Sequence, residues 1–271
     1  MRLPRPIHRS PYASPLGLAV LLAIAAPAGA TTSDLKSLDL EELLKVRVVG
    51  ASKYEQTQDE VPAAVSIITR EEIRRFGWRT LGEALQTLPG LYSTYDRQYA
   101  QVGARGLGLP GDFNTRTLIT INGNRVNDPL FDGGPTGRDF PLDMDLVERI
   151  EFIPGPGGAV YGQNAMFGVV NVVTRTGADM AGTEASIQLQ APGQSREARL
   201  SWGGKFDNGF NVLLSVAGLR ARGEDLYLSY GSSGIKGWAR NMDGERNAQA
   251  FAQISRGALQ FEWTHDTEAA E

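Results

Sequence analysis

The chain has 271 residues, with 31 acidic and 27 basic side chains and a formal net charge of −4. It contains no cysteine, which excludes disulfides, thiolate metal sites and cysteine nucleophiles. No basic patch stands out, so nucleic acid is not an expected partner. The two histidines, His8 and His265, cannot build a Ser-His-Asp triad or a zinc site. We therefore expect no enzymatic activity, no metal and no cofactor.

Residues 1–30 have the pattern of a secretory signal peptide. Three arginines lie among the first nine residues, and an apolar run follows over 16–26. This run is too short to span a bilayer as a helix, and the Ala-Gly-Ala sequence at 28–30 fits the rule for signal cleavage. We expect the mature chain to begin at Thr31, and the alternative is an uncleaved anchor helix.

Residues 31–62 are predicted to form a short amphipathic helix and an extended tether. In a helix over 33–45, Leu40, Leu43 and Leu44 share one face. The following residues start with a short β-branched run and then become polar, which indicates an extended and flexible connection.

Residues 63–177 are predicted to fold as a compact α+β domain. A strand over 65–68 is followed by a capping box at Thr69–Glu72, which opens a helix. A second capping box at Thr80–Glu83 opens another helix, which is expected to reach Pro89-Gly90. Asn122-Gly123 between two apolar, β-branched runs is the strongest short signal for a β-hairpin.

The most distinctive stretch of this domain is its end, VERIEFIPGPGGAVYGQNAMFGVVNVVTR, over 147–175. A strand over 149–153 meets a run of prolines and glycines at 154–158, and a second strand is expected over 168–174. Strands joined by so glycine-rich a turn lie where backbone packs closely on backbone.

Residues 182–271 alternate apolar and polar side chains in five separate segments. Such segments are typical of transmembrane barrel strands, although a soluble antiparallel sandwich shows the same alternation. Tight turns and one long connector fit a barrel with short periplasmic turns and longer outer loops. The predicted strands are 185–191, 198–203, 210–219, 248–254 and 259–264, with tight turns at 207–209 and 256–257 and the long connector at 221–245.

Three motifs in this order resemble the plug domain of TonB-dependent outer-membrane receptors. They are VPAAVSIIT at 61–69, ARGLG with LITING at 104–108 and 118–123, and the stretch at 147–175. The resemblance implies an α+β plug domain followed by antiparallel transmembrane β-barrel strands. A barrel of this family has about 22 strands. Because five strands cannot close one, we expect an incomplete barrel and an N-terminal part of a longer receptor.

The resemblance also implies a function and a location. Receptors of this family bind a scarce ligand at the surface of a Gram-negative bacterium and import it into the periplasm, using energy relayed by the TonB protein. Ferric siderophores are the first ligand class implied and cobalamin is the second, and outer-membrane lipid surrounds the barrel. The alternative is a stand-alone periplasmic binding module that has the plug fold but performs no transport.

Two sets of functional residues follow from the resemblance. The counterpart of the TonB box is VRVVGAS, that is, Val46, Arg47, Val48, Val49, Gly50, Ala51 and Ser52. A β-branched run on a tether can add as a strand to a partner's sheet, although it can also be an ordinary first strand of the domain. Ligand contacts are implied on two outward loops, 93–101 and 127–139, with the candidates Tyr95, Arg97, Gln98, Tyr99, Phe131, Asp132 and Arg138.

A third expectation concerns the contact between plug and barrel. In relatives, two arginines help to tie these parts together. Arg105 matches one of them, whereas Pro154 stands where the other is usual.

Overall fold

The computed structural model describes residues 47–48, 56–57, 65–109, 111–191, 194–231 and 234–270. All of them lie within Leu44–Glu271, one of the two compact units of the chain. The predictions of a signal peptide and of a helix over 33–45 lie outside the described residues. Among the described helices, none is long and apolar enough to cross a membrane.

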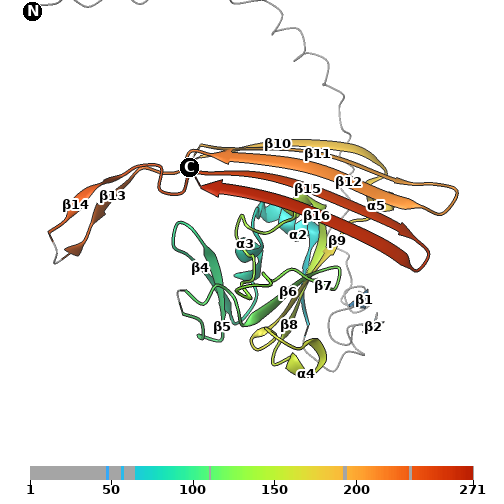
Figure 1. The fold of residues 1–271 in the computed structure, drawn as a ribbon, viewed down its shortest axis with the longest axis horizontal. Coiled ribbons are helices and arrows are strands. Elements are labelled where there is room, and N and C mark those ends of the chain that lie inside the picture. The colour runs from blue at the N-terminus through green and yellow to red at the C-terminus, as the bar shows by residue number, and fades with distance from the viewer. Residues whose placement is uncertain are drawn as a thin grey trace, which may run out of the picture. The chain divides into compact units, whose positions relative to one another are not determined.

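A five-stranded mixed sheet forms the centre of the plug domain (Figure 1). Its strand order is β3-β8-β9-β6-β7, in which β6 and β9 are parallel and the other neighbours are antiparallel. The two predicted hairpins, β6–β7 and β8–β9, are confirmed. The strands are β3 (Ser66–Thr69), β6 (Thr117–Ile121), β7 (Asn124–Arg125), β8 (Val147–Pro154) and β9 (Gly168–Thr174).

Both predicted capping boxes start helices. Thr69 caps α2 (Arg70–Phe76) and Thr80 caps α3 (Leu81–Leu85), each with a glutamate that bonds back to the cap backbone. The prediction that the second helix reaches Pro89-Gly90 is wrong. It ends at Leu85, because the next residues form tight turns in which the Leu88 amide donates to the Leu85 carbonyl oxygen.

The plug contains further short elements that the sequence pattern did not predict. A hairpin of β4 and β5 follows α3 and carries the first outward loop. Two short helical turns lie within and after the last hairpin. These elements are β4 (Leu91–Tyr95), β5 (Ala100–Ala104), α4 (Gly158–Tyr161) and α5 (Gly177–Met180). The 3-10 turn η2 (Met144–Leu146) precedes this hairpin.

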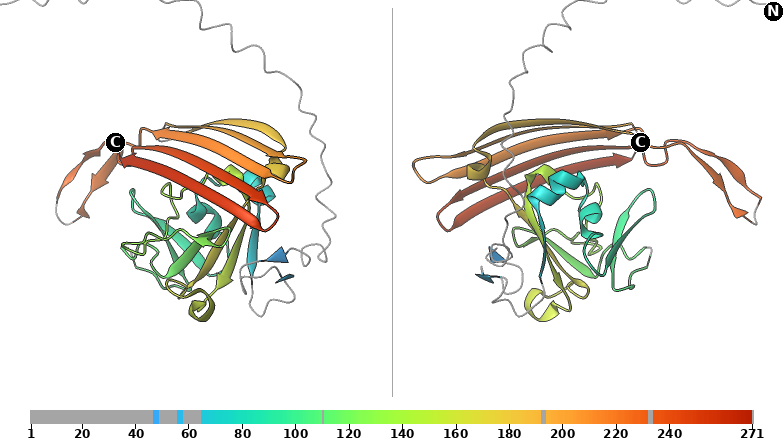
Figure 2. Two further views of the ribbon diagram at one scale, coloured as in Figure 1. Left: turned by 45° about the vertical axis from the view of Figure 1, so that its right-hand side comes forward. Right: turned by 180° about the vertical axis from the view of Figure 1, so that it is seen from behind.

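A second five-stranded sheet follows, and every pair of neighbouring strands in it is antiparallel. All five predicted strands are confirmed. The long connector contains a hairpin that was expected to be a loop, β13 (Leu226–Ser229) and β14 (Lys236–Ala239), and this hairpin projects beyond the sheet (Figures 1 and 2). The strands of the sheet are β10 (Gly182–Gln190), β11 (Ser195–Lys205), β12 (Asn211–Ala221), β15 (Glu245–Arg256) and β16 (Leu259–Ala270).

The two faces of this second sheet differ in chemistry and in exposure. The inward face lies over the plug, and its Leu213 and Phe251 belong to the same core cluster as Leu85 and Ile150 of the plug. The outward face is apolar and exposed, with Ile187 at 80% exposure. An apolar face of this extent marks a contact with lipid or with another protein. Its other exposed large side chains include Leu189, Leu200, Trp202, Leu214, Val216, Leu259, Phe261 and Trp263.

The last plug helix, α5, lies directly on the second sheet. A Cβ on Gly177 would collide with the carbonyl oxygen of Val212 in β12, and a Cβ on Gly203 of β11 would lie 2.7 Å from the Cβ of Met180. Only glycine permits two backbones to approach so closely. The C-terminal end of the plug is therefore in backbone contact with two strands of the sheet.

Candidate functional site

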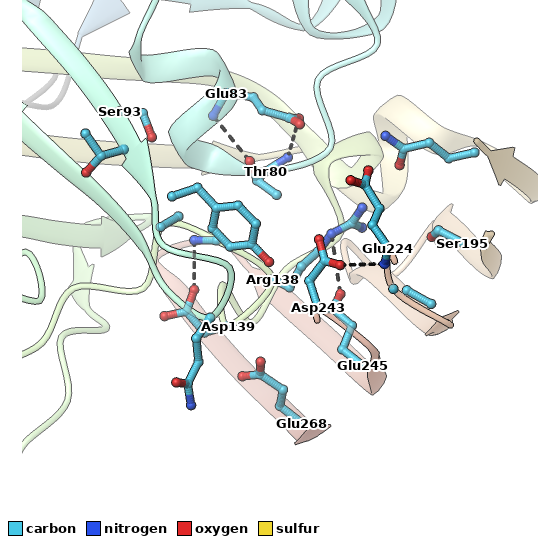
Figure 3. Close-up of a pocket in the computed structure, with 18 of the residues that line it drawn as sticks. Thr80, Glu83, Ser93, Arg138, Asp139, Ser195, Glu224, Asp243, Glu245 and Glu268 are labelled. Atoms are coloured by element: carbon cyan, nitrogen blue, oxygen red, sulfur yellow. Dashed lines mark hydrogen bonds and ion pairs between the residues drawn. The ribbon is translucent and has the colours of Figure 1, made fainter. Parts of the chain in front are cut away.

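An open cavity of about 330 Å³ lies between the plug and the loop end of the second sheet (Figure 3). One wall comes from α3, the β4–β5 hairpin and residues 137–139. The other wall comes from the ends of β10, β11, β12, β15 and β16. The side chains that line it are mostly polar, and the carboxylates among them are Glu83, Asp139, Glu224, Asp243, Glu245 and Glu268.

The cavity carries an excess of negative charge. Arg138 lines it, but Glu197 and Glu245 each lie 3.5 Å from its guanidinium. Burial raises the pKa of the Asp139 carboxyl to about 6, although the Gly137 amide donates a hydrogen bond to it at 2.8 Å. At neutral pH this carboxyl remains mostly ionised. The wall therefore attracts cationic or hydrogen-bond-donating groups and repels anionic ones.

Arg97 joins the first outward loop of the plug to the long connector of the second sheet. Its guanidinium lies 3.1 Å from Asp243 and 3.3 Å from Glu224. The loop turns at Arg97 itself, which has a left-handed backbone with φ of 80°. This predicted ligand residue thus contacts two carboxylates at the cavity edge, and its side chain is 37% exposed.

The structure separates the other predicted ligand residues into two places. Tyr95, Gln98 and Arg138 line the cavity, whereas the ring of Tyr99 packs edge-on against Phe113 at 5.2 Å.

On the second outward loop, Phe131 is 75% exposed, and Asp132 accepts hydrogen bonds from Arg125 and Gln163. The first outward loop therefore supplies most of the predicted residues at the cavity, and the roles of all of them as ligand contacts stay predictions.

A buried ion-pair network between the plug and the inward face of the second sheet was missed by sequence reasoning. Arg79, which precedes α3, lies 2.8 Å from Glu197 on β11 and 3.5 Å from Asp143. Arg199, two residues further along β11, lies 3.7 Å from Asp143. The side chains of Arg199 and Asp143 are 4% and 2% exposed. Charged residues at inward positions of an otherwise alternating strand were the signal that could have revealed it.

Further polar contacts join the plug to the inward face. Arg175 donates two hydrogen bonds of 2.8 Å to Glu184 of β10. The side-chain amides of Asn247 and Gln249 on β15 donate to the backbone carbonyls of Arg138 and Phe140. The sheet covers these backbone carbonyl groups of the plug, and the amide side chains supply the hydrogen bonds that the groups need. The inward face of the sheet is therefore polar where it contacts loops of the plug.

Arg105 does not make such a contact among the described residues. It is exposed, follows β5 in a left-handed conformation with φ of 54°, and forms no ion pair within the described ranges. Its predicted role in tying plug to barrel stays a prediction.

Only part of the predicted TonB box is described. Arg47 and Val48 form β1 (Arg47–Val48), which pairs antiparallel with β2 (Gln56–Thr57). The other residues of 46–52 lie outside the described ranges. Within the described part of the chain, no group of three or more histidine, aspartate or glutamate side chains could hold a metal ion.

Comparison with known proteins places these features in a family. Residues 57–169 match the family model of the TonB-dependent receptor plug domain. The iron-regulated outer membrane virulence protein of Vibrio cholerae is 25% identical over 255 residues, which cover 90% of this chain and 37% of that protein. The vitamin B12 transporter BtuB of Vibrio vulnificus is 32% identical over 175 residues, or 63% of this chain and 27% of that protein.

Solved structures share the fold. The ferric-catecholate import receptor Fiu of E. coli K12 superposes with a TM-score of 0.58 at 19% identity, over 82% of this chain and 30% of that one. A variant of the ferric enterobactin receptor of Pseudomonas aeruginosa gives 0.55 at 23% identity, over 76% and 33%. The chain thus spans about a third of the length of these relatives. Residues 57–169 therefore belong to the TonB-dependent receptor plug domain family, and the plug together with the antiparallel strands that follow it has the fold of outer-membrane receptors.

Proposed function

We propose that the chain supplies the plug and the first barrel strands of a receptor that binds a scarce ligand at the cell surface and imports it into the periplasm. The observation that carries this proposal is the two-faced second sheet. Its inward face packs on the plug through a shared core and ion pairs, while its outward face is apolar and exposed. This is the arrangement that a plugged barrel in a bilayer requires.

The proposed domain boundaries follow the sequence pattern. Residues 1–30 are the signal peptide that is removed, and 31–62 carry the tether with the TonB-box-like segment. Residues 63–177 are the plug, and 182–271 are the first strands of the barrel. The mature receptor lies in the outer membrane of a Gram-negative bacterium, and TonB relays energy to it through Val46–Ser52. The receptor moves its ligand without chemical change, so it is a transporter and not an enzyme.

The proposed ligand is a ferric siderophore or cobalamin. Relatives are named as an iron-regulated outer membrane protein, a vitamin B12 transporter and ferric siderophore receptors, which supports both classes. The acidic cavity is open at the first outward loop, where a bound ligand would meet Tyr95 and Gln98. The second outward loop supplies the exposed Phe131 as a separate contact.

Growth on defined nutrients tests this function. A strain that lacks the gene is expected to lose growth on one iron–siderophore complex or on cobalamin at nanomolar supply, and the intact gene is expected to restore it. Equal growth of both strains on every iron and cobalamin source would contradict import. Surface binding without accumulation, in cells with working TonB, would favour the binding-module alternative.

Substitution of Tyr95 tests the ligand contact at the cavity. We expect Tyr95→Ala in the receptor expressed from its full gene to weaken ligand binding about tenfold, because aromatic side chains supply large contact areas. Tyr95→Phe is the matched control and should keep most of the affinity. Isothermal titration with the nutrient identified by growth measures both. If Tyr95→Ala and Phe131→Ala both bind like the wild type, the assignment of these loops is wrong.

A further inference from the structure

A carboxylate on β16 is bonded to the tip of a plug hairpin. Glu262 accepts a hydrogen bond from the side-chain amide of Asn122 and a second one, of 3.0 Å, from that of Asn124. Both donors lie at the turn between β6 and β7, and β7 is an edge strand of the plug sheet. Because the acceptor is a carboxylate, these bonds are charge-assisted and stronger than bonds between neutral groups. We name these two bonds the Glu262 contact.

Side chains of the second sheet hold Glu262 in this position. The amides of Gln253 and Gln260 donate to its Oε1 at 2.9 and 2.6 Å. Gln253 is directly opposite Glu262 on β15, and it also donates to the hydroxyl of Thr174 in the plug at 3.0 Å. The backbone amide of Thr174 in turn donates to the side chain of Asn122 at 2.9 Å. Polar bonds therefore join the β6–β7 hairpin and the end of β9 to two strands of the second sheet.

A line of buried polar side chains continues from the Glu262 contact into the plug sheet. The Gly123 amide donates to the side chain of Asn171 on β9 at 3.0 Å, and Asn171 donates to Glu151 on β8 at 3.0 Å. Glu151 is fully buried, and Arg149 of the same strand donates to it at 2.8 Å. Buried polar groups that satisfy one another hold a single arrangement. Strands β6, β7, β8 and β9 are therefore tied to one another and, through Glu262, to the second sheet.

The remaining strand of the plug sheet lacks such a connection. β3 is the other edge strand, and its four residues pair with β8 alone, from Ser66 opposite Phe152 to Thr69 opposite Arg149. Within the described part of the chain, the side chains of β3 form no hydrogen bond to the second sheet. The two edges of the plug sheet therefore differ in how they are held.

We propose that the Glu262 contact stays closed throughout an import cycle. Strands β6, β7, β8 and β9 then remain on the second sheet, and the passage opens where β3 separates from β8. Local opening takes the least free energy where the fewest contacts are lost, which favours β3 because β7 at the other edge carries the Glu262 contact. Glu262 touches no ligand and is a positioning residue for transport. The proposal rests on the proposed import function.

A covalent link tests whether the contact has to open. The 271 residues contain no cysteine, so Asn124→Cys/Glu262→Cys introduces a single pair of thiols. Any cysteine encoded further along the full gene is replaced by serine. A short bismaleimide joins the two thiols in whole cells, and uptake and surface binding of the nutrient identified by growth are then measured. We expect the linked receptor to import as fast as the same variant without the reagent, with the cysteine-free receptor treated in parallel as the control.

A disulfide at the other edge is the matched comparison. Ser66→Cys/Phe152→Cys places two thiols directly opposite one another on β3 and β8. The Cα atoms of such antiparallel neighbours lie about 4.5–5.5 Å apart, which a disulfide spans. We expect the oxidised form to bind the nutrient at the surface and to import none, and we expect reduction to restore import. This recovery separates the effect of the link from any effect of losing the Phe152 ring.

Substitution of Glu262 tests the contact without a link. In the purified receptor from the full gene, we expect hydrogen exchange over residues 117–125 to be at least about tenfold faster in Glu262→Ala than in the wild type, because hydrogen bonds to charged groups are the stronger ones. Glu262→Gln keeps one acceptor oxygen and should lie between the two. Gln260→Ala is the matched control, since it removes a bond to Glu262 within the second sheet and leaves the plug bonded.

The outcomes separate this proposal from the function on which it rests. Without import by the cysteine-free receptor, the proposed function fails and the proposal falls with it. If that receptor does import, the proposal alone is overturned when linkage of the Asn124→Cys/Glu262→Cys pair stops import, or when the oxidised Ser66→Cys/Phe152→Cys receptor imports as fast as its reduced form. Equal exchange rates in Glu262→Ala and the wild type would also overturn it.

Discussion

Deletion of Val46–Ser52 from the receptor expressed from its full gene is expected to abolish energised uptake and to leave surface binding of the ligand unchanged. The segment starts with a β-branched run, which can pair with the edge of a partner's sheet through backbone hydrogen bonds. The cavity and both outward loops lie in other parts of the chain, so ligand contacts should survive the deletion. Uptake of labelled ligand by whole cells, with and without an uncoupler, gives both quantities in one assay.

A proline substitution makes this test sharper. Val48→Pro keeps the length of the tether but removes a backbone donor, so strand pairing with TonB should be lost and uptake should fall to the background without TonB. Val48→Ile is the matched control, since it keeps both the donor and the β-branch. If the deletion strain still accumulates ligand at the wild-type rate, the segment is not the site at which TonB acts.

Loss of Arg79 is expected to cause the largest decrease in the stability of the plug and of its attachment to the second sheet. Arg79→Met would remove one cationic partner from Glu197, whose side chain is 14% exposed, and from the fully buried Asp143. Removal of one member of a buried ion pair costs about 3–5 kcal/mol, whereas loss of an exposed pair costs about 0–1 kcal/mol. We expect the plug of this variant to unfold or detach at clearly lower urea concentration than in the wild type, as followed by proteolysis of plug and barrel fragments.

The double variant shows whether the ion pair itself is responsible. Arg79→Met with Glu197→Gln should be less destabilised than the sum of the single variants, because neither charge is then left without its partner. Arg116→Met is the matched control, since its contact with Asp112 at 3.5 Å is much more exposed, with side chains 42% and 25% exposed. Equal urea midpoints for Arg79→Met and Arg116→Met would show that the network adds nothing to plug retention.

Much of the fold followed from local sequence signals. The capping boxes at Thr69 and Thr80 and the turn at Asn122-Gly123 use only neighbouring residues, so they fold as predicted wherever the chain places them. The strands of the second sheet were equally clear, because a period of two is fixed by backbone geometry. The capping box that opens α5, at Thr176–Asp179, was also present in the sequence and was overlooked.

The features that were not predicted depend on contacts between distant residues. The second helix was expected to be longer, but residues 86–90 turn toward β4 instead. Nothing near Arg79 in sequence indicates Glu197, which is 118 residues away. The cavity likewise forms only when the end of the plug hairpin β4–β5 meets the second sheet. Sequence pattern therefore predicted most of the helices and strands, and the family resemblance implied the two outward loops. The packing of plug on sheet determined which of their residues meet.

The glycine contact of α5 has a consequence for how a passage could open. Because Gly177 lies against the β12 backbone and Gly203 against Met180, the last turn of the plug cannot shift without displacing the wall itself. At the opposite end of the domain, β3 is a four-residue edge strand that pairs with β8 alone. In the proposed function, a force on the N-terminal side would reach this four-residue edge strand first. We therefore expect the domain to peel from its beginning while its end stays fixed on the second sheet.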